Sequence, residues 1–339
     1  MNNWSKLYQL ADRIKALKPW RFMYEDDITG VRDPVTGTIG FISVMGNLGE
    51  HYSVTVYLGE RAFGQFLELS RNPDNAVPET VLEIPQIMLS FEDRDFTEKE
   101  DRTIMNEIGI KYSGKKSWPV FRSYRPGMVP WFLEEKEQES MVHFLEQFLE
   151  IAVRPESETK DVESGSNLQD IFMVRECNKV GENIKWNDTF QKILIPSLEE
   201  LTIRVDSGLL ARARNTPVGK NIYEIDFFLT PAQVREKNRR PFFSYLLLIV
   251  DERSGMVITS ELLDPSDGIE QMLAKIPGIL LRKFSTATSL PQAVFAGSPR
   301  LADLLLPLMK SLGIKLQYKK GLRSLEMAKS SILEYFQKR

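Results

Sequence analysis

An apolar run at residues 241–250, PFFSYLLLIV, constrains the fold of this chain more than any other feature. Its second half is apolar at every position, so a strand built from it must be buried on both faces. The run is about half of the roughly 20 residues that a membrane-spanning helix needs, which favours a buried strand. Turn residues at 251–255, DERSG, then lead into a second strand at 256–263.

The pattern after this hairpin alternates between helix and strand. The expected elements are a helix from Gly268 that is interrupted at Pro277, a strand at 292–297, a helix at 301–312, a strand at 314–318 and a final helix at 322–336. Together with a strand at 221–229, they predict a mixed sheet with helices on its faces and 246–250 as the central strand.

The first half of the chain predicts a second unit of mixed type. Its expected elements are a helix at 4–17, strands at 28–33, 38–46 and 52–59, a helix at 61–70, a strand at 84–91, a helix that starts at an N-cap Thr97 with Glu100 three residues on, and a closing helix through 141–152. Turn residues separate the first three strands, so they form an antiparallel meander.

A polar, acidic segment without aromatic residues lies at 155–168, PESETKDVESGSNL. Such a segment cannot bury enough apolar surface to fix its backbone, so we place a linker there. The chain of 339 residues is long enough for two cores. The sequence therefore predicts an α/β protein, α+β in places, with an N-terminal domain at 1–154 and a C-terminal domain at 169–339.

The overall composition excludes several classes of protein. With 44 Lys and Arg against 47 Asp and Glu, the formal net charge is -3, so no global field attracts nucleic acid or a membrane. The single Cys177 cannot form an intramolecular disulfide, and the first residues contain no apolar stretch of signal-peptide length. We expect a cytoplasmic protein with no membrane partner and no cofactor.

One local stretch has the chemistry of a recognition surface. Residues 111–131, KYSGKKSWPVFRSYRPGMVPW, contain five basic side chains, five aromatic ones, three prolines and no acid. We interpret the stretch as a loop because of its prolines and glycines. Basic side chains could pair with phosphates while aromatic rings stack on bases. The binding candidates are Lys115, Lys116, Trp118, Arg122, Tyr124, Arg125 and Trp131. The alternative is an ordered loop that packs across its own domain.

Most motifs of nucleotide, zinc and serine-hydrolase chemistry are absent from the sequence. There is no GxxxxGK[ST], GxGxxG, GxSxG or HExxH, and the two histidines are His51 and His143. The spacing of His143 on the closing helix predicts a solvent-facing residue. Cys177 has no histidine nearby in sequence that could activate it.

Carboxylates offer the remaining route to catalysis. Asp251 follows the strand LLLIV, and the hairpin, PQAVFAGSPRLADLLLPLMKSLGIKLQY and final helix resemble a ribonuclease H-like or integrase core in their order. That resemblance implies a first metal ligand at Asp251, with Glu261 and Glu326 as further candidates and Mg²⁺ or Mn²⁺ as cofactor. The second ligand of such a core is replaced by 296–299, AGSP, which predicts an inactive copy. The simpler interpretation makes Asp251 a turn-forming residue.

The chain also resembles a family of bacterial proteins, common in bacilli, known as a domain of unknown function. The resemblance covers residues 4–149 and rests on the opening WxxLYxLA, VMGNLGEHYSVTVYLGERA, SFEDR and WPVFRSYRPGMVPWFLEEKE. The second half is similar to a companion uncharacterised domain. The resemblance implies two domains and carries no catalytic residues over.

From the sequence we therefore expect a non-catalytic binding module. Its partner would be a nucleic acid or a protein, bound through residues 111–131. The first alternative is a metal-dependent, nuclease-like enzyme built on Asp251. The second is a structural or assembly protein that uses neither site.

Overall fold

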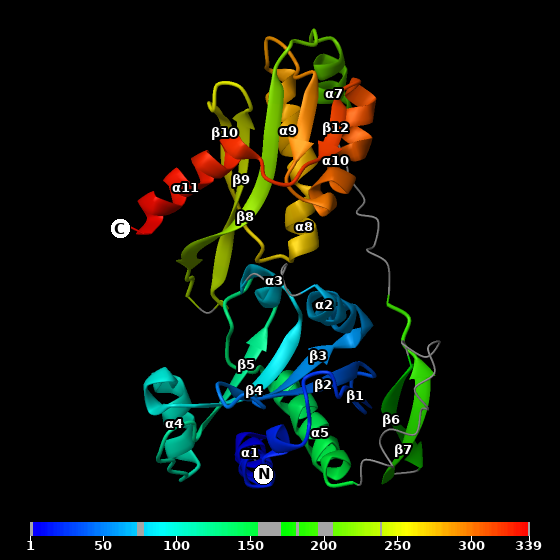
Figure 1. Ribbon diagram of the computed structural model, residues 1–339, viewed down its shortest axis with the longest axis vertical. Coiled ribbons are helices and arrows are strands. Elements are labelled where there is room, and N and C mark those ends of the chain that lie inside the picture. The colour runs from blue at the N-terminus through cyan, green and yellow to red at the C-terminus, as the bar shows by residue number, and fades with distance from the viewer. Residues whose placement is uncertain are drawn as a thin grey trace. The chain divides into compact units, whose positions relative to one another are not determined.

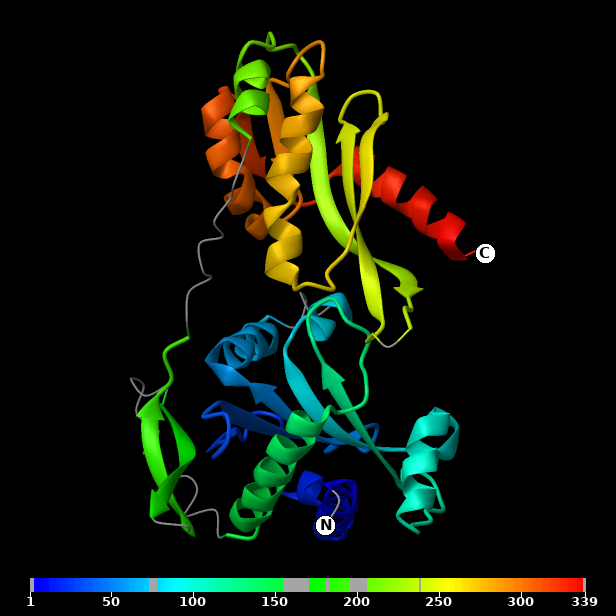
Figure 2. The same cartoon turned by 180° about the vertical axis from the view of Figure 1, so that it is seen from behind.

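A computed structural model describes residues 3–72, 78–154, 171–180, 183–195, 206–237 and 239–337. The chain divides into two compact units, each built on its own sheet (Figures 1 and 2). Unit 1 contains Met1–Arg125 and Pro130–Ser197, and unit 2 contains Pro126–Val129 and Leu198–Arg339. The predicted linker at 155–168 lies outside the described residues.

Unit 1 contains a seven-stranded sheet of order β5-β4-β3-β2-β1-β6-β7. Its strands are β1 (Thr29–Arg32), β2 (Ile39–Met45), β3 (Tyr52–Leu58), β4 (Gln86–Glu92), β5 (Trp118–Tyr124), β6 (Ile171–Val180) and β7 (Asn183–Lys192). The predicted meander of the first three strands is confirmed. The hairpin of β6 and β7 pairs with β1 in parallel, so unit 1 extends past the predicted boundary. Sequence periodicity does not report this pairing because its partners are far apart in the chain.

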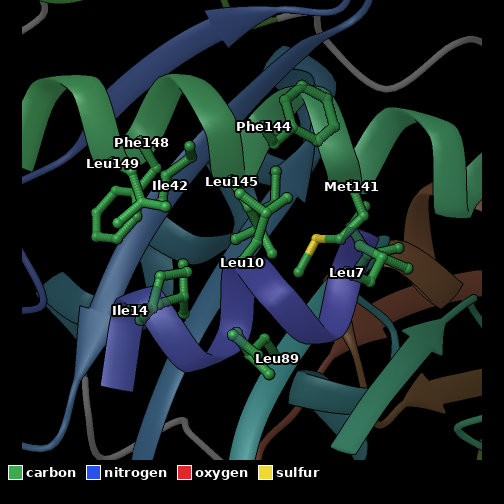
Figure 3. Close-up of a cluster of buried hydrophobic side chains, with 14 of the residues drawn as sticks. Leu7, Leu10, Ile14, Ile42, Leu89, Met141, Phe144, Leu145, Phe148 and Leu149 are labelled. Carbon is green, nitrogen blue, oxygen red and sulfur yellow. The ribbon is translucent and has the colours of Figure 1, made fainter. Parts of the chain in front are cut away.

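Helices cover both faces of the unit 1 sheet. They are α1 (Asn3–Leu17), α2 (Gly59–Arg71), α3 (Pro78–Leu82), α4 (Lys99–Glu107) and α5 (Glu135–Ala152), with short 3-10 turns at Pro19–Arg21 and Arg94–Phe96. Side chains from α1 and α5 meet over one face of the sheet, where Leu10, Ile14 and Leu145 are buried (Figure 3). Residues of α2 pack on the opposite face against β2 and β3. Both faces of the sheet are therefore partly enclosed.

The start of α4 differs by one residue from the prediction. Its N-cap is Glu98, whose side chain accepts from the N3 backbone while Asp101 accepts from the Glu98 backbone at 2.9 Å. Thr97 instead donates its hydroxyl hydrogen to the carbonyl of Arg94, which closes the preceding 3-10 turn. A carboxylate can act in a reciprocal capping box, and so the sequence pattern that begins at Thr97 was assigned to the wrong residue.

Unit 2 contains a five-stranded sheet of order β10-β9-β8-β11-β12. Its strands are β8 (Ile222–Val234), β9 (Phe242–Asp251), β10 (Val257–Leu263), β11 (Ala293–Ala296) and β12 (Lys315–Tyr318). The first three pair antiparallel, and β8, β11 and β12 run parallel. The predicted burial of β9 on both faces is confirmed, since Leu247 and Leu248 belong to different hydrophobic clusters. The central strand is nevertheless β8.

Helices also cover both faces of the unit 2 sheet. They are α7 (Ser207–Arg214), α8 (Ile269–Ala274), α9 (Ile276–Ser285), α10 (Pro299–Leu312) and α11 (Arg323–Gln337). Helices α8, α9 and α10 bury apolar side chains on one face, and α11 packs on the other. Ser298 caps α10 by accepting from the Leu301 amide, and Gly313 ends it with a φ of 68°. Among the helices described, none is long and apolar enough to cross a membrane.

Candidate functional site

The basic aromatic stretch at 111–131 is not one loop. Its middle forms β5, an edge strand of the unit 1 sheet that pairs with β4. Pro119 is tolerated because an edge strand needs partners on one side alone. The segment Pro126–Val129 clusters with unit 2, where the Val129 amide donates to the carbonyl of Pro241. The prediction of a loop was therefore wrong, and its prolines mark the edge and the ends of a strand.

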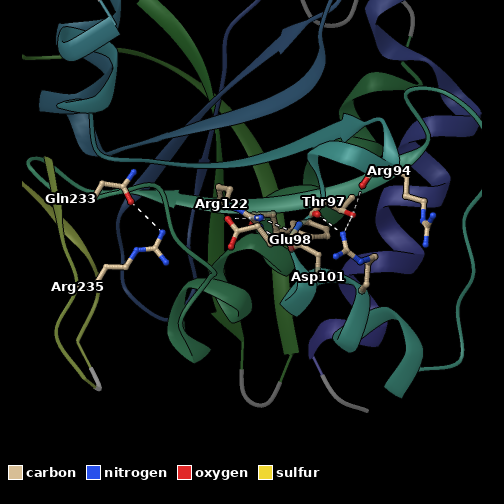
Figure 4. Close-up of polar contacts among 9 residues, drawn as sticks. Arg94, Thr97, Glu98, Asp101, Arg122, Gln233 and Arg235 are labelled. Atoms are coloured by element: carbon tan, nitrogen blue, oxygen red, sulfur yellow. Dashed lines mark hydrogen bonds and ion pairs between the residues drawn. The ribbon is translucent and has the colours of Figure 1, made fainter. Parts of the chain in front are cut away.

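Arg122 is the centre of a buried ion pair (Figure 4). Its guanidinium donates two hydrogen bonds to the carboxylate of Asp101, at 2.8 and 2.7 Å, and lies 3.5 Å from Glu98. The ring of Phe132 lies 4.5 Å from the guanidinium carbon. Burial disfavours the charge, but the hydrogen bonds and charge of Asp101 outweigh it and raise the pKa of Arg122. Arg122 thus fixes β5 to α4.

Two more of the predicted cations are also used inside the unit. Arg125 pairs with Glu134 at 2.7 Å and with Glu137 at 2.8 Å. Lys116 donates from Nζ to the backbone oxygens of Gly49 and Glu50, at 2.6 and 2.8 Å. These contacts hold the ends of β5 in place and occupy the cations that a phosphate would need.

The other residues of the stretch divide by exposure. Lys111 and Lys115 are exposed, whereas Trp118, Tyr124 and Trp131 are half-buried. Trp118 packs toward the core on α1 and α5, and the amide and carbonyl of Trp131 bond to Ser123 at the edge of β5. The predicted seven residues therefore do not form one exposed cluster. Tyr124 lies on a cavity described below.

Asp251 sits at the turn after β9, where Oδ1 accepts hydrogen bonds from the Ser254 amide and hydroxyl, both below 3 Å. Burial alone would raise its pKa, but these hydrogen bonds lower it. Glu261 lies on β10, 4.0 Å from Arg282, and Glu326 is exposed in the first turn of α11. Within the described residues, no group of three His, Cys, Asp or Glu side chains could hold a metal ion.

Asp226 was not singled out from the sequence. It lies on the central strand β8. Gly297 packs so closely on its carboxylate that the Cβ of any other residue at position 297 would lie 2.5 Å from Oδ2. Burial raises the pKa of Asp226 to about 6, while Lys329 lowers it and Glu326 raises it further. Its hydrogen bond within the described residues comes from the neighbouring amide of Phe227, at 2.9 Å. The one acid in an otherwise apolar stretch, IDFFL, was the available sequence signal.

His143 also differs from its prediction. Its Nδ1 lies 3.0 Å from Oδ1 of Asp33, and Oδ2 of Asp33 accepts from the hydroxyl of Ser140 at 2.6 Å. Ser140 and His143, both on α5, thus bind the buried carboxylate of Asp33 at the turn after β1. The helix face of His143 is used to anchor this turn.

A cavity of about 550 Å³ lies in unit 1, over the face of the sheet opposite α1 and α5. Its volume is in the range of small-molecule sites. The lining residues come from the segment before β1, from β2, β3, β4 and β5, and from α2 and α3 with the turn after it. They are Glu25, Asp26, Met45, Tyr57, Phe66, Leu69, Ser70, Val81, Ile84, Gln86, Met88 and Tyr124.

The sheet face below this cavity carries two buried hydroxyl groups without a hydrogen-bond partner in the described structure, those of Ser53 and Thr55. They alternate with Tyr57 along β3, so all three project from the same face. Met45 lies directly opposite Ser53, and Met88 lies directly opposite Thr55. Each unpartnered hydroxyl therefore has a lining methionine as its cross-strand neighbour. Such buried groups cost free energy unless a partner arrives.

These observations define a protein of two mixed α/β units, with a ligand-sized cavity in the first. The chain belongs to the family described as a domain of unknown function (DUF7309), whose model matches residues 4–174. A second domain of unknown function (DUF6930) matches residues 209–333. The predicted resemblance to two uncharacterised domains is confirmed, and the first match extends into β6. No curated protein and no solved structure matches the chain.

Proposed function

We propose that the protein is a non-catalytic binding module whose ligand site is the cavity of unit 1. The observation that carries this proposal is the pair of buried hydroxyls of Ser53 and Thr55 below the cavity, which have no hydrogen-bond partner in the described part of the chain. Native proteins satisfy most buried polar groups, so a pair on one sheet face calls for a ligand or water. The neighbouring methionines have flexible side chains and adapt to an occupant.

A fragment screen by ligand-observed NMR tests this function. Ser70 is exposed on α2 and lines the cavity, so Ser70→Trp fills the space from outside the core. Glu68→Trp places the same ring on an exposed position of α2 that does not line the cavity. We expect fragments that bind the wild type and Glu68→Trp but not Ser70→Trp. If no fragment distinguishes the two variants, the proposal is wrong.

The proposal of a nucleic-acid or protein partner at 111–131 has less support. Arg122 and Arg125 are held in internal ion pairs, and Lys116 is bound to backbone oxygens. Lys111 and Lys115 remain exposed as phosphate-binding candidates. Two exposed cations supply little of the electrostatic affinity that nucleic-acid binding requires.

A metal-dependent nuclease built on Asp251 also has less support. Its support is the order of unit 2, in which three antiparallel strands precede two strands that pair in parallel. Asp251, however, lies on the second strand of that sheet, and its carboxylate serves the turn. Two-metal chemistry needs several converging carboxylates. Cleavage of DNA or RNA with Mg²⁺ or Mn²⁺ that is lost in Asp251→Asn would favour this alternative over the binding module.

A further inference from the structure

The lining of the cavity has an uneven distribution of charge. Glu25 and Asp26 lie next to each other in the lining, and none of the described residues that line the cavity is a lysine, arginine or histidine. The segment that carries them is held in place, because the hydroxyl of Ser43 donates to the Glu25 carbonyl at 2.8 Å. The Tyr24 amide also donates to Asp27 at 2.8 Å. The backbone of this segment is therefore held in place, and it carries two exposed acidic side chains at the rim of the cavity.

The two carboxylates repel each other. The partial burial of its carboxyl group raises the pKa of Glu25, and the charge of Asp26 raises it further. A positive charge placed beside them would favour the ionised form of Glu25. The negative charge of Glu25 and Asp26 therefore makes this part of the cavity lining complementary to a cation.

Aromatic rings form another part of the lining. The rings of Tyr57 and Phe66 stack with their centroids 4.4 Å apart. Gln86 of β4 lies between Tyr57 of β3 and Tyr124 of β5 in the same row of the sheet. Flat apolar groups pack well on such rings, and a cation near a ring face is attracted by its electrons. An occupant with a flat apolar body suits this part of the cavity.

The unpartnered hydroxyls match the same chemistry. A serine or threonine hydroxyl has two acceptor lone pairs and can receive an N–H from an ammonium group. Thr55 is 1% exposed, and Met88, its neighbour across the strands, lines the cavity. The Thr55 acceptor therefore lies next to a residue of the cavity lining.

We infer that the cavity selects a small organic cation, an ammonium group carried on a flat apolar body. This inference rests on the proposed function of the cavity and adds the class of ligand. The two carboxylates bind the ammonium group, and Tyr57, Phe66 and Tyr124 contact the apolar body. Within the described residues, no third carboxylate joins Glu25 and Asp26 in a group that could hold a metal ion.

Three probes that share an indole ring with a two-carbon arm and differ in the group at its end test the inference by isothermal titration calorimetry. They are tryptamine, which is a cation at pH 7, the neutral 3-ethylindole, and the anion indole-3-propionate. We expect tryptamine to bind at least about tenfold more tightly than 3-ethylindole, and the anion to bind most weakly, because each charge meets two carboxylates. The double variant Glu25→Gln with Asp26→Asn should remove the tenfold preference and leave 3-ethylindole binding unchanged. Glu50→Gln with Glu68→Gln, two exposed carboxylates outside the lining, is the matched control.

The outcomes separate the ligand class from the cavity function. If 3-ethylindole or the anion binds as tightly as tryptamine, or if the preference survives in Glu25→Gln with Asp26→Asn, selection for a cation is overturned. If none of the probes binds while other fragments distinguish Ser70→Trp from Glu68→Trp, the ligand class is overturned and the cavity function stands. If no fragment distinguishes those variants, both proposals fail.

Discussion

Arg122 in unit 1 and Asp226 in unit 2 are both charged residues on β-strands, but their surroundings differ. Arg122 faces Asp101 with two short hydrogen bonds, so its charge is compensated. Asp226 has a backbone hydrogen bond and no ion pair among the described residues. A compensated buried charge stabilises one arrangement of the chain, whereas an uncompensated one disfavours its own ionisation. The comparison teaches that a residue with binding chemistry in the sequence can be structural, while burial can shift the pKa of a less conspicuous carboxyl group.

The largest expected effect is at Arg122. Arg122→Met should lower the free energy of unfolding of unit 1 by about 3 to 5 kcal/mol, because it leaves the buried charge of Asp101 without its ion-pair partner. The double variant with Asp101→Leu should recover part of this loss, since no buried charge is then left unpaired while α4 loses the capping hydrogen bond that Asp101 accepts. All five tryptophans lie in unit 1, so urea unfolding followed by tryptophan fluorescence reports on it. A loss below about 1 kcal/mol would mean that the pair does not fix β5.

The next effect is at Asp226 and has a pH dependence. Because the pKa of Asp226 is raised to about 6 in the folded protein, the folded state binds its proton more tightly than the unfolded state does. The stabilisation by this proton is complete below about pH 4 and is lost as the pH rises through about 6. Asp226→Asn should therefore stabilise unit 2 by roughly 2 to 3 kcal/mol at pH 7.5 and have little effect at pH 4.

Hydrogen exchange of unit 2 amides, measured by mass spectrometry at both pH values, checks this prediction. Asp303→Asn removes an exposed carboxylate from α10 of the same unit and is the control. Equal stabilisation by Asp226→Asn at pH 4 and pH 7.5 would contradict the assignment of the pKa to this carboxyl group.

A smaller pair of effects extends the comparison to neutral groups. Thr230 is as buried as Thr55, but its hydroxyl donates to the Ser244 carbonyl at 2.9 Å. Thr230→Val should destabilise its unit by about 1 kcal/mol, because a buried hydrogen bond is lost. Thr55→Val should leave the stability of unit 1 unchanged or raise it by up to about 1 kcal/mol, because no hydrogen bond is lost. Urea unfolding measures both, and a loss at Thr55 equal to that at Thr230 would show that its hydroxyl has a partner.

The smallest effect concerns the exposed cations of the 111–131 stretch. If single-stranded DNA binds there, Lys111→Ala with Lys115→Ala should change the slope of log affinity against log salt by about 1.4, which corresponds to two phosphate contacts. Arg125→Ala should change it little, because Arg125 is paired with Glu134 and Glu137. Binding assays at several salt concentrations measure the slopes. A larger change in Arg125→Ala than in the lysine variant would mean that its ion pairs open to phosphate.

Much of the fold was accessible from periodicity. The helix at 4–17, the meander, the buried strand and the alternating helices and strands of unit 2 were predicted because each depends on the spacing of apolar residues within one segment. The β6–β7 hairpin was missed, and its membership of the unit 1 sheet depends on parallel pairing between Gly30 and Val174. No local pattern encodes such a pairing. The candidate site was accessible to a smaller extent, since Tyr124 was the one predicted binding residue that lines the cavity.

The sequence by itself determined the composition of the two cores, the positions of most elements and the absence of several catalytic motifs. The tertiary structure decided which polar residues are paired. Asp101 and Arg122 are 21 residues apart in the chain. Met88 of β4 lies opposite Thr55 of the neighbouring strand β3. Whether a charge or a hydroxyl is compensated depends on atoms within about 3 Å, and residues distant in sequence supply those atoms. For that reason the sequence could identify the residues with binding chemistry, while folding assigned Arg122 to the architecture and Thr55 to the cavity.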